Sequence, residues 1–373
     1  MGTVVVSGSG LWKPKESITN EELVNSYNEF ASRFNVQNAG AIAVGDVVEK
    51  LQSSSEFIEK ASGVKQRYVY CREGILDIDR MRPRLSVRAD DELSHQAEIA
   101  VDAARQAMEA SGKTAKEIDM VIVSSAYTER AYPAMAIEVQ QALGIEGFGF
   151  DMLVACSGAT FAIHRAADAI AAGSAGCALV INPELITPQV NFTDRDSHFI
   201  FGDVSTATIL EPAETCTSDH SYEIVATLAL TQYSSNVRSN FGYLSFACDM
   251  DPFADDKLFC QNGRKVFREV CPLTSEHLAA LLKKADIGVS DVRRWWLHQA
   301  NINMNQHITQ RLLGRDTDFD RAPIVLDEFA NTGSAGSIVA FHLHNEDLVA
   351  GDVGVICSFG AGYSLGSLVL RKR

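Results

Sequence analysis

Phe148-Gly-Phe-Asp-Met-Leu-Val-Ala-Cys156-Ser-Gly-Ala-Thr-Phe-Ala-Ile163 is the segment around which the rest of the chain is arranged. Its apolar first half predicts a buried strand, Ser157 and Gly158 predict a tight turn, and the residues from Ala159 onward have helical spacing. Cys156 is therefore expected at a strand-to-helix elbow, where helix amides favour the thiolate and lower the thiol pKa from about 8.5. This environment suits a nucleophile, and a buried structural cysteine is the alternative.

The size and charge of the chain limit what it can do. Its 373 residues exceed what one hydrophobic core usually serves, so we expect two fused halves, residues 1–215 and 220–373. The formal net charge of -15 argues against general binding to nucleic acid or to an anionic membrane surface, because both are themselves negative.

The cysteine pattern and the apolar runs indicate the compartment. The eight cysteines form no C-x-x-C pair and no Cys/His cluster with zinc spacing, so no metal is expected. The N-terminal residues lack the pattern of a signal peptide, and no apolar run approaches the roughly 20 residues that span a bilayer. We expect a soluble, cytoplasmic protein with reduced thiols.

Strand and helix patterns alternate along the chain and repeat in its second half. Such alternation predicts an α/β fold with a largely parallel sheet covered on both faces, and the repeat suggests two units with a site at their junction. The elements that match between the halves are the strands 118–125 and 292–298 and the long helices 94–111 and 266–285. Further helices are predicted over residues 20–34, 44–51, 136–143 and 338–343, and a terminal hairpin over 353–358 and 364–370.

Three segments of the second half could contribute chemistry. His298 follows the apolar strand of Trp295-Trp-Leu, at the strand end where ligands of open α/β sheets bind, although a lone His on such a strand is often a core residue. Asn331 precedes the small residues that lead into the helix over 338–343, so it either faces a ligand or caps that helix. The glycine-rich turn that begins at Phe359 lacks the Lys-Ser/Thr of a phosphate-binding loop.

Five short motifs occur in one order across both halves: Ala155-Cys156-Ser-Gly, Phe201-Gly-Asp203, His298-Gln-Ala-Asn301, Asn331-Thr and Phe359-Gly-Ala-Gly362. Together they resemble the thiolase-fold condensing enzymes, and most closely the β-ketoacyl-[acyl carrier protein] synthase III family. The resemblance covers nearly the whole chain. It implies a thiolase-like five-layered αβαβα fold and a homodimer.

The resemblance also implies a reaction and a role for each matched residue. Cys156 would receive an acyl group from acyl-CoA, and His298 and Asn331 would donate hydrogen bonds to a malonyl thioester carbonyl as carbon dioxide leaves. The product would be a β-ketoacyl-acyl carrier protein of fatty acid biosynthesis, made without a cofactor. Ala361 would contribute an oxyanion amide, Phe359 would lie beside the histidine, and Tyr132 would reach across the dimer to the partner's acyl pocket.

Malonyl-acyl carrier protein, an acidic partner, requires a local cationic surface on this acidic chain. The best candidate is a cluster at the start of the helix over 266–285, which in the resembling family flanks the tunnel mouth. We call it the basic patch, and it consists of Arg264, Lys265 and Arg268. Cations at a helix N-terminus oppose the helix dipole, which favours an anionic partner there; a solvated helix start is the alternative.

The chain departs from the family pattern at three places. Ala361 replaces a glycine, Asn303 replaces an arginine that contacts carrier or CoA, and the segments 35–55 and 71–91 are longer than in compact members. A degradative thiolase is disfavoured, because Phe359 stands where that enzyme needs a second active-site cysteine. The remaining alternatives are an acyltransferase that acts on a small acceptor, an enzyme that condenses two acyl chains head to head, and a catalytically silent dimeric subunit.

Overall fold

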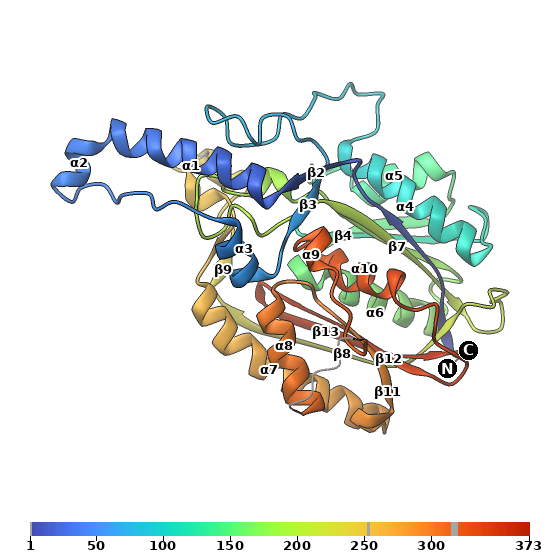
Figure 1. The fold of residues 1–373 in the computed structure, drawn as a ribbon. Helices are drawn as coiled ribbons and strands as arrows, with labels where there is room; N and C mark the ends of the chain where they lie inside the picture. The colour runs from blue at the N-terminus through green and yellow to red at the C-terminus, as the bar shows by residue number, and fades with distance from the viewer. Residues whose placement is uncertain (1, 252–253, 315–319) are drawn as a thin grey trace.

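The computed structural model describes residues 2–251, 254–314 and 320–373, and Figure 1 shows their arrangement in five layers. Helices α4 (His95–Ser111) and α5 (Met135–Leu143) form one outer layer, and α7 (Gly263–Ala285) and α8 (Ile302–Leu313) form the other. Helices α6 (Gly158–Ala171) and α10 (Gly336–Leu343) lie in the middle, between two layers of strands. The predicted five layers are confirmed.

Nine strands hydrogen-bond in the order β11-β12-β13-β8-β1-β7-β6-β4-β5. Of the eight neighbouring pairs in this described sheet, only β4–β5, β4–β6 and β11–β12 are parallel, so the prediction of a largely parallel sheet is wrong. The physical reason is clearest at the C-terminus, where the single residue Ala361 separates β12 from β13 and can only return the chain antiparallel. The strands are β1 (Val4–Trp12), β4 (Met120–Ser125), β5 (Phe148–Leu153), β6 (Ala178–Glu184), β7 (Val204–Pro212), β8 (Tyr222–Ser234), β11 (Val292–Leu297), β12 (Val353–Gly360) and β13 (Gly362–Lys372).

The two halves share one continuous apolar core. Ile163 of α6 and Ile338 of α10 pack between Ile122 and Val180 of the first half and Trp296 of the second, and all five side chains are buried. Separate outer cores hold α4 and α5 on one side and α7 and α8 on the other. Because the sheet also continues from β7 through β1 to β8, the boundary between residues 215 and 220 remains a prediction.

Capping residues fix the long helices where the sequence predicts them. Ser94 accepts a hydrogen bond from the amide of Ala97 at the start of α4, and Gly112 ends that helix with a φ of 71°. The predicted helix over 44–51 is wrong. Helix α1 (Asn20–Gln37) is followed by the short α2 (Ala39–Ala43), and Gly45, with a φ of 83°, stops helical structure there. Helices α1 and α2 form an arm that projects from the body in Figure 1.

Strand β5 differs from its prediction as a buried strand. It is the edge of the nine-stranded sheet, and Phe148, Phe150 and Leu153 are exposed by 44%, 37% and 58%. Its apolar residues therefore cover an open edge rather than a core.

Six smaller elements complete the described helices and strands that position the site. They are β2 (Glu16–Thr19), α3 (Ser55–Ser62), β3 (Gln66–Val69), β9 (Val237–Arg238), β10 (Cys260–Gln261) and α9 (Leu326–Phe329). In the described ranges, no helix has the length and apolar character needed to cross a membrane.

Candidate active site

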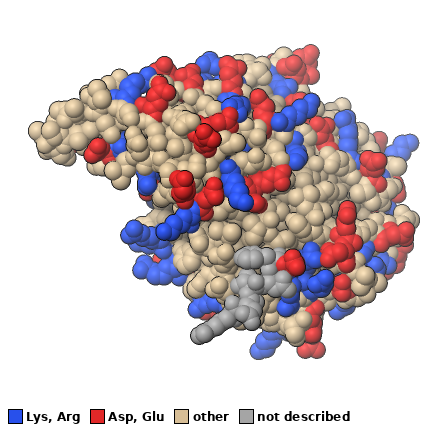
Figure 2. Space-filling view, in the orientation of Figure 1, with Lys and Arg blue, Asp and Glu red and all other residues tan. Residues whose placement is uncertain are grey.

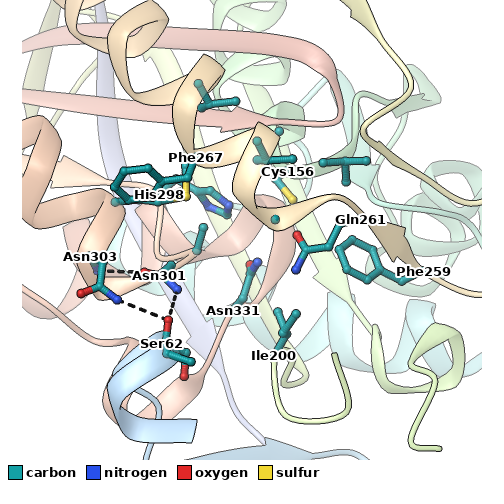
Figure 3. Close-up of a pocket in the computed structure, with 18 of the residues that line it drawn as sticks. Ser62, Cys156, Ile200, Phe259, Gln261, Phe267, His298, Asn301, Asn303 and Asn331 are labelled. Carbon is teal, nitrogen blue, oxygen red and sulfur yellow. Dashed lines mark hydrogen bonds between the residues drawn. The ribbon is translucent and has the colours of Figure 1, made fainter. Parts of the chain in front are cut away.

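A cavity of about 620 Å³ lies at the junction of the two halves. Cys156 of the first half lines it together with His298, Asn331, Phe359 and Ala361 of the second half. Figure 3 shows Cys156, His298 and Asn331 around the same space. Most of the other lining side chains are apolar, including Phe57, Phe199, Phe201, Phe259, Phe267 and Met304. A mostly apolar cavity of this size with a few convergent polar groups is typical of a small-molecule site.

Cys156 lies on a sharp elbow, as its sequence context predicts. A single 3-10 turn, Ala155–Ser157, joins β5 to α6, and Ala155 has a left-handed φ of 43°, which is rare for a residue with a side chain. Ser157 holds the elbow from the other half, because its hydroxyl donates to the carbonyl of Ser364 at 2.8 Å. Gly158 has to be a glycine, since a Cβ there would lie 2.5 Å from the hydroxyl of Ser124.

The pKa of Cys156 is shifted in the direction opposite to its prediction. Burial, with a smaller contribution from the carboxylate of Glu184, raises the pKa of the Cys156 thiol to about 12. The prediction considered the helix amides alone and missed both the apolar wall and this carboxylate. Cys156 is therefore a thiol in the resting protein, and its proton has to leave during any attack on a thioester.

His298 directly follows β11 and is 2% exposed. Its backbone amide donates to the carbonyl of Cys357 at 2.8 Å, and its ring meets Phe359 edge-on at 5.0 Å between centroids. Burial lowers the pKa of His298 to about 3, so the imidazole is neutral at pH 7. Nδ1 is buried with no hydrogen-bond partner among the described residues. An unpaired buried N–H is less tolerable than an unpaired acceptor, so we assign the proton to Nε2.

Asn331 is held by backbone and side-chain hydrogen bonds. Its amide donates to the carbonyl of Ile200 at 2.9 Å, and its own carbonyl accepts from Gly202 at 3.1 Å, so the Phe201-Gly-Asp203 motif positions this segment. Its side-chain oxygen accepts from the amide of Gly333 at 3.0 Å. The residue that precedes α10 is Ala335, so Asn331 does not cap that helix.

The turn between β12 and β13 lines the cavity beside Cys156. A Cβ on Gly360 would lie 2.8 Å from the Cβ of Cys156 and 2.9 Å from its backbone nitrogen. The predicted oxyanion residue Ala361 follows directly and lines the same cavity. The polypeptide of this turn therefore packs directly on the elbow.

The remaining predicted site residues lie outside the cavity or at its edge. Arg264 lines the cavity, whereas Lys265 and Arg268 are exposed on the same first turns of α7. None of the three forms an ion pair with a described residue. Figure 2 shows cationic side chains gathered over the start of α7. Tyr132 does not line the cavity and is 80% exposed, as a residue that reaches a second subunit would be.

Two polar residues of the site escaped the sequence analysis. Gln261 of β10 lies between Cys156 and Asn331 in Figure 3 and lines the cavity. Glu184 ends β6 and is 1% exposed, close enough to Cys156 to raise its pKa. A carboxylate at the end of the apolar strand over 178–182 was the available signal for Glu184, whereas nothing in the pattern distinguished Gln261.

Comparisons with known proteins cover both halves of the chain. Residues 150–227 match the family described as 3-oxoacyl-[acyl-carrier-protein (ACP)] synthase III, and residues 282–372 match its C-terminal part. The chain is 53% identical to a beta-ketodecanoyl-[acyl-carrier-protein] synthase of Pseudomonas aeruginosa, over 94% of this chain and 100% of that protein. It is 25% identical to a beta-ketoacyl-[acyl-carrier-protein] synthase III of Ehrlichia ruminantium, over 98% of each.

Solved structures share the fold. The crystal structure of 3-oxoacyl-[acyl-carrier-protein] synthase III from Aquifex aeolicus has a TM-score of 0.76 and 21% identity, with 99% of this chain and 100% of that chain covered. The corresponding protein from Pseudomonas aeruginosa gives the same TM-score and identity over 99% and 98% of the chains. The thiolase-like fold is thereby confirmed.

Proposed function

Because this chain belongs to the 3-oxoacyl-[acyl-carrier-protein] synthase III family, we propose that it catalyses the decarboxylating condensation of an acyl group with malonyl-acyl carrier protein. The acyl group comes from acyl-CoA, and the product is a β-ketoacyl-acyl carrier protein of fatty acid biosynthesis. The observation that carries this proposal is the single cavity that contains Cys156, His298 and Asn331.

In the first half-reaction, the sulfur of Cys156 attacks the thioester carbonyl of acyl-CoA. A carbon–sulfur bond forms to Cys156, the bond to the CoA sulfur breaks, and the proton of the thiol ends on the departing CoA. Amides of the elbow and of Ala361 stabilise the oxyanion that forms on the carbonyl oxygen. The thiolate develops at the N-terminus of α6, so the helix dipole stabilises the transition state even though burial disfavours the resting thiolate.

In the second half-reaction, His298 and Asn331 bind the thioester oxygen of the malonyl unit. The neutral imidazole donates from Nε2, and the amide of Asn331 donates from Nδ2, because its oxygen already accepts from Gly333. Loss of carbon dioxide leaves its electron pair on the α-carbon, and the two donors stabilise the resulting enolate. That carbon attacks the acyl-Cys156 carbonyl, the sulfur leaves as thiolate, and a proton returns it to the thiol. No metal or prosthetic group takes part in these steps.

We further propose that the acyl donor is octanoyl-CoA or a chain of similar length. The relative that is 53% identical carries the name beta-ketodecanoyl synthase, and condensation adds two carbons of malonyl to the donor. The apolar lining of the cavity supports a donor longer than acetyl.

Two surfaces support the proposed partners. The exposed cations of the basic patch suit the acidic carrier protein, because Arg264 lines the cavity and none of the three forms an ion pair with a described residue. The open apolar edge of β5 suits pairing with β5 of a second copy, which would make the enzyme a homodimer. Light scattering would report the dimer, and a monomer at micromolar concentration would contradict this second surface.

The products that the purified protein forms distinguish the proposed function from the alternatives. The purified protein should convert octanoyl-CoA and malonyl-acyl carrier protein into β-ketodecanoyl-carrier protein and carbon dioxide, faster than with acetyl-CoA. Acyl transfer without carbon dioxide would indicate an acyltransferase, and consumption of two acyl-CoA molecules without malonyl would indicate head-to-head condensation. Absence of all three reactions would indicate a silent subunit.

A further inference from the structure

Glu184 is a buried carboxyl group that the mechanism above does not use. It ends β6 of the first half, and its side chain points into the junction with the second half, where Ser334 follows the Asn331-Thr motif. One of its oxygens accepts from the backbone amide of Ser334 at 2.8 Å and from the Ser334 hydroxyl. The other accepts from the amide of Ala126 at 3.1 Å. No cation forms an ion pair with Glu184 in the described part of the chain, so its contacts are hydrogen bonds alone.

Gly333 connects Glu184 to Asn331, because it contacts both residues. Gly333 has a left-handed φ of 57°, and a Cβ there would lie 2.9 Å from the carboxyl carbon of Glu184. The turn is thus pressed against the carboxyl group and can be built only with glycine. The amide of Gly333 in turn donates to the side-chain oxygen of Asn331 at 3.0 Å. This bond decides which end of the Asn331 amide faces the cavity.

We propose that Glu184 is a positioning residue: it fixes the turn at Gly333 and Ser334 so that Asn331 presents its Nδ2 to the malonyl thioester. The inference deepens the proposed function and rests on it. Glu184 touches neither substrate nor the reacting atoms, and it acts on both half-reactions through its neighbours.

Glu184 also has a second, electrostatic effect, which adds to the larger effect of burial on the pKa of the Cys156 thiol. Burial raises the pKa of Glu184 to about 7, and the like charge of Asp203 adds to that rise against the hydrogen bonds from Ser334 and Ala126. Its charge raises the pKa of both Tyr127 and Cys156. Near neutral pH the carboxyl group exists in both its protonated and its ionised form. Removal of its charge should therefore lower the pKa of the Cys156 thiol.

Glu184→Gln tests the two effects separately, because they change the two half-reactions in opposite directions. The substitution keeps the shape but removes the charge, and it sets an NH₂ group against a donor of Ala126 or Ser334. Alkylation of Cys156 by iodoacetamide at pH 8 should become about threefold to tenfold faster, since one pKa unit changes the thiolate population about tenfold. Decarboxylation of malonyl-acyl carrier protein should fall by about tenfold or more, because a displaced donor stabilises the enolate poorly.

Two further variants separate this account from loss of structure. Ser334→Ala removes a donor and leaves the carboxyl group in place, so it should slow decarboxylation while accelerating alkylation less than Glu184→Gln does. Glu211→Gln removes another fully buried carboxylate, which pairs with Lys113 far along the sheet, and should leave the alkylation rate and the decarboxylation rate unchanged. Alkylation of Glu184→Gln at or below the wild-type rate overturns the charge effect, and wild-type decarboxylation by both Glu184→Gln and Ser334→Ala overturns the positioning.

Failure of the proposed function would look different from failure of this inference. A wild-type protein that decarboxylates no malonyl thioester contradicts the proposed function, together with the positioning of Asn331 for it. The iodoacetamide comparison needs no substrate, and it would still decide whether Glu184 controls the thiol.

Discussion

Gly360→Ala adds one methyl group against the nucleophile. Gly360 has no positive φ, so alanine is compatible with its backbone, and the cost of the substitution is steric. The new Cβ would stand 2.8 Å from the Cβ of Cys156 and 2.9 Å from its nitrogen, where ordinary contact begins near 3.4 Å. The turn and the elbow therefore have to separate by roughly half an ångström, and neither side can yield by a side-chain rotation.

The expected magnitudes follow from this separation. Overpacking of this kind typically costs about 1 to 3 kcal/mol. With an unfolding entropy of about 2.1 cal/mol/K per residue over 373 residues, Tm should fall by about 1 to 4 °C. The separation also moves the amide of Ala361 away from the sulfur of Cys156. A misplacement of about 1 Å can cost about 10²-fold, so acylation should slow by roughly tenfold to hundredfold.

Stopped reactions with octanoyl-CoA followed by intact-mass analysis would measure the acylation rate, and calorimetry would measure Tm. Gly40→Ala is the matched control, because a Cβ at Gly40 in α2 meets nothing within 4 Å. It should be acylated at the wild-type rate. If Gly360→Ala were also acylated at that rate with an unchanged Tm, the packing of the turn on the elbow would be refuted.

Three other predictions follow from the site. His298→Ala and Asn331→Ala should each leave acylation measurable but slow malonyl decarboxylation by about 10²- to 10³-fold, and wild-type decarboxylation by both would refute their roles. Reversal of all three cations of the basic patch to Glu should raise KM for malonyl-acyl carrier protein far more than for a short malonyl thioester, whereas equal losses would indicate a damaged site. The pKa of Glu184 is raised from 4.5 to about 7 on folding, so its stabilisation is present below pH 4.5 and lost as pH rises through 7. Wild type should therefore lose up to about 3 kcal/mol of unfolding free energy relative to Glu184→Gln between pH 5 and pH 8 in urea titrations, and equal pH dependence of the two proteins would contradict this.

The fold could be predicted where local signals agree with tertiary packing. Ser94 and Gly112 bound α4 in the sequence as they do in the structure, because a cap residue and a left-handed glycine act locally. The same reasoning placed Cys156 at an elbow. Five layers followed from the resemblance of the motifs rather than from periodicity.

The errors have a common physical origin in neighbours that are distant in sequence. An apolar strand at a sheet edge has the same local pattern as one in the centre, so the exposure of Phe150 in β5 could not be read from the segment itself. The pKa of Cys156 depends on a carboxylate in another strand, Glu184, and on burial by the second half. The prediction of a parallel sheet failed because strand direction depends on the connections, and Ala361 alone joins β12 to β13.

The site residues were predicted to the extent that their motifs are specific. Cys156, His298 and Asn331 come together in one cavity, which periodicity alone could not have shown, because Cys156 lies more than a hundred residues before the other two. Glu184 and Gln261 carry no motif of their own. Their importance emerges only from what surrounds them in three dimensions.

The most direct test of the account is the location of the acyl group after incubation with octanoyl-CoA alone. Intact mass should increase by one octanoyl group, peptide mapping should place that group on Cys156, and Cys156→Ala should remain folded but unlabelled. Addition of malonyl-acyl carrier protein should then remove the label as β-ketodecanoyl-carrier protein. An octanoyl group on any residue other than Cys156, or a Cys156→Ala protein that is still acylated, would contradict the assignment of Cys156 as the nucleophile.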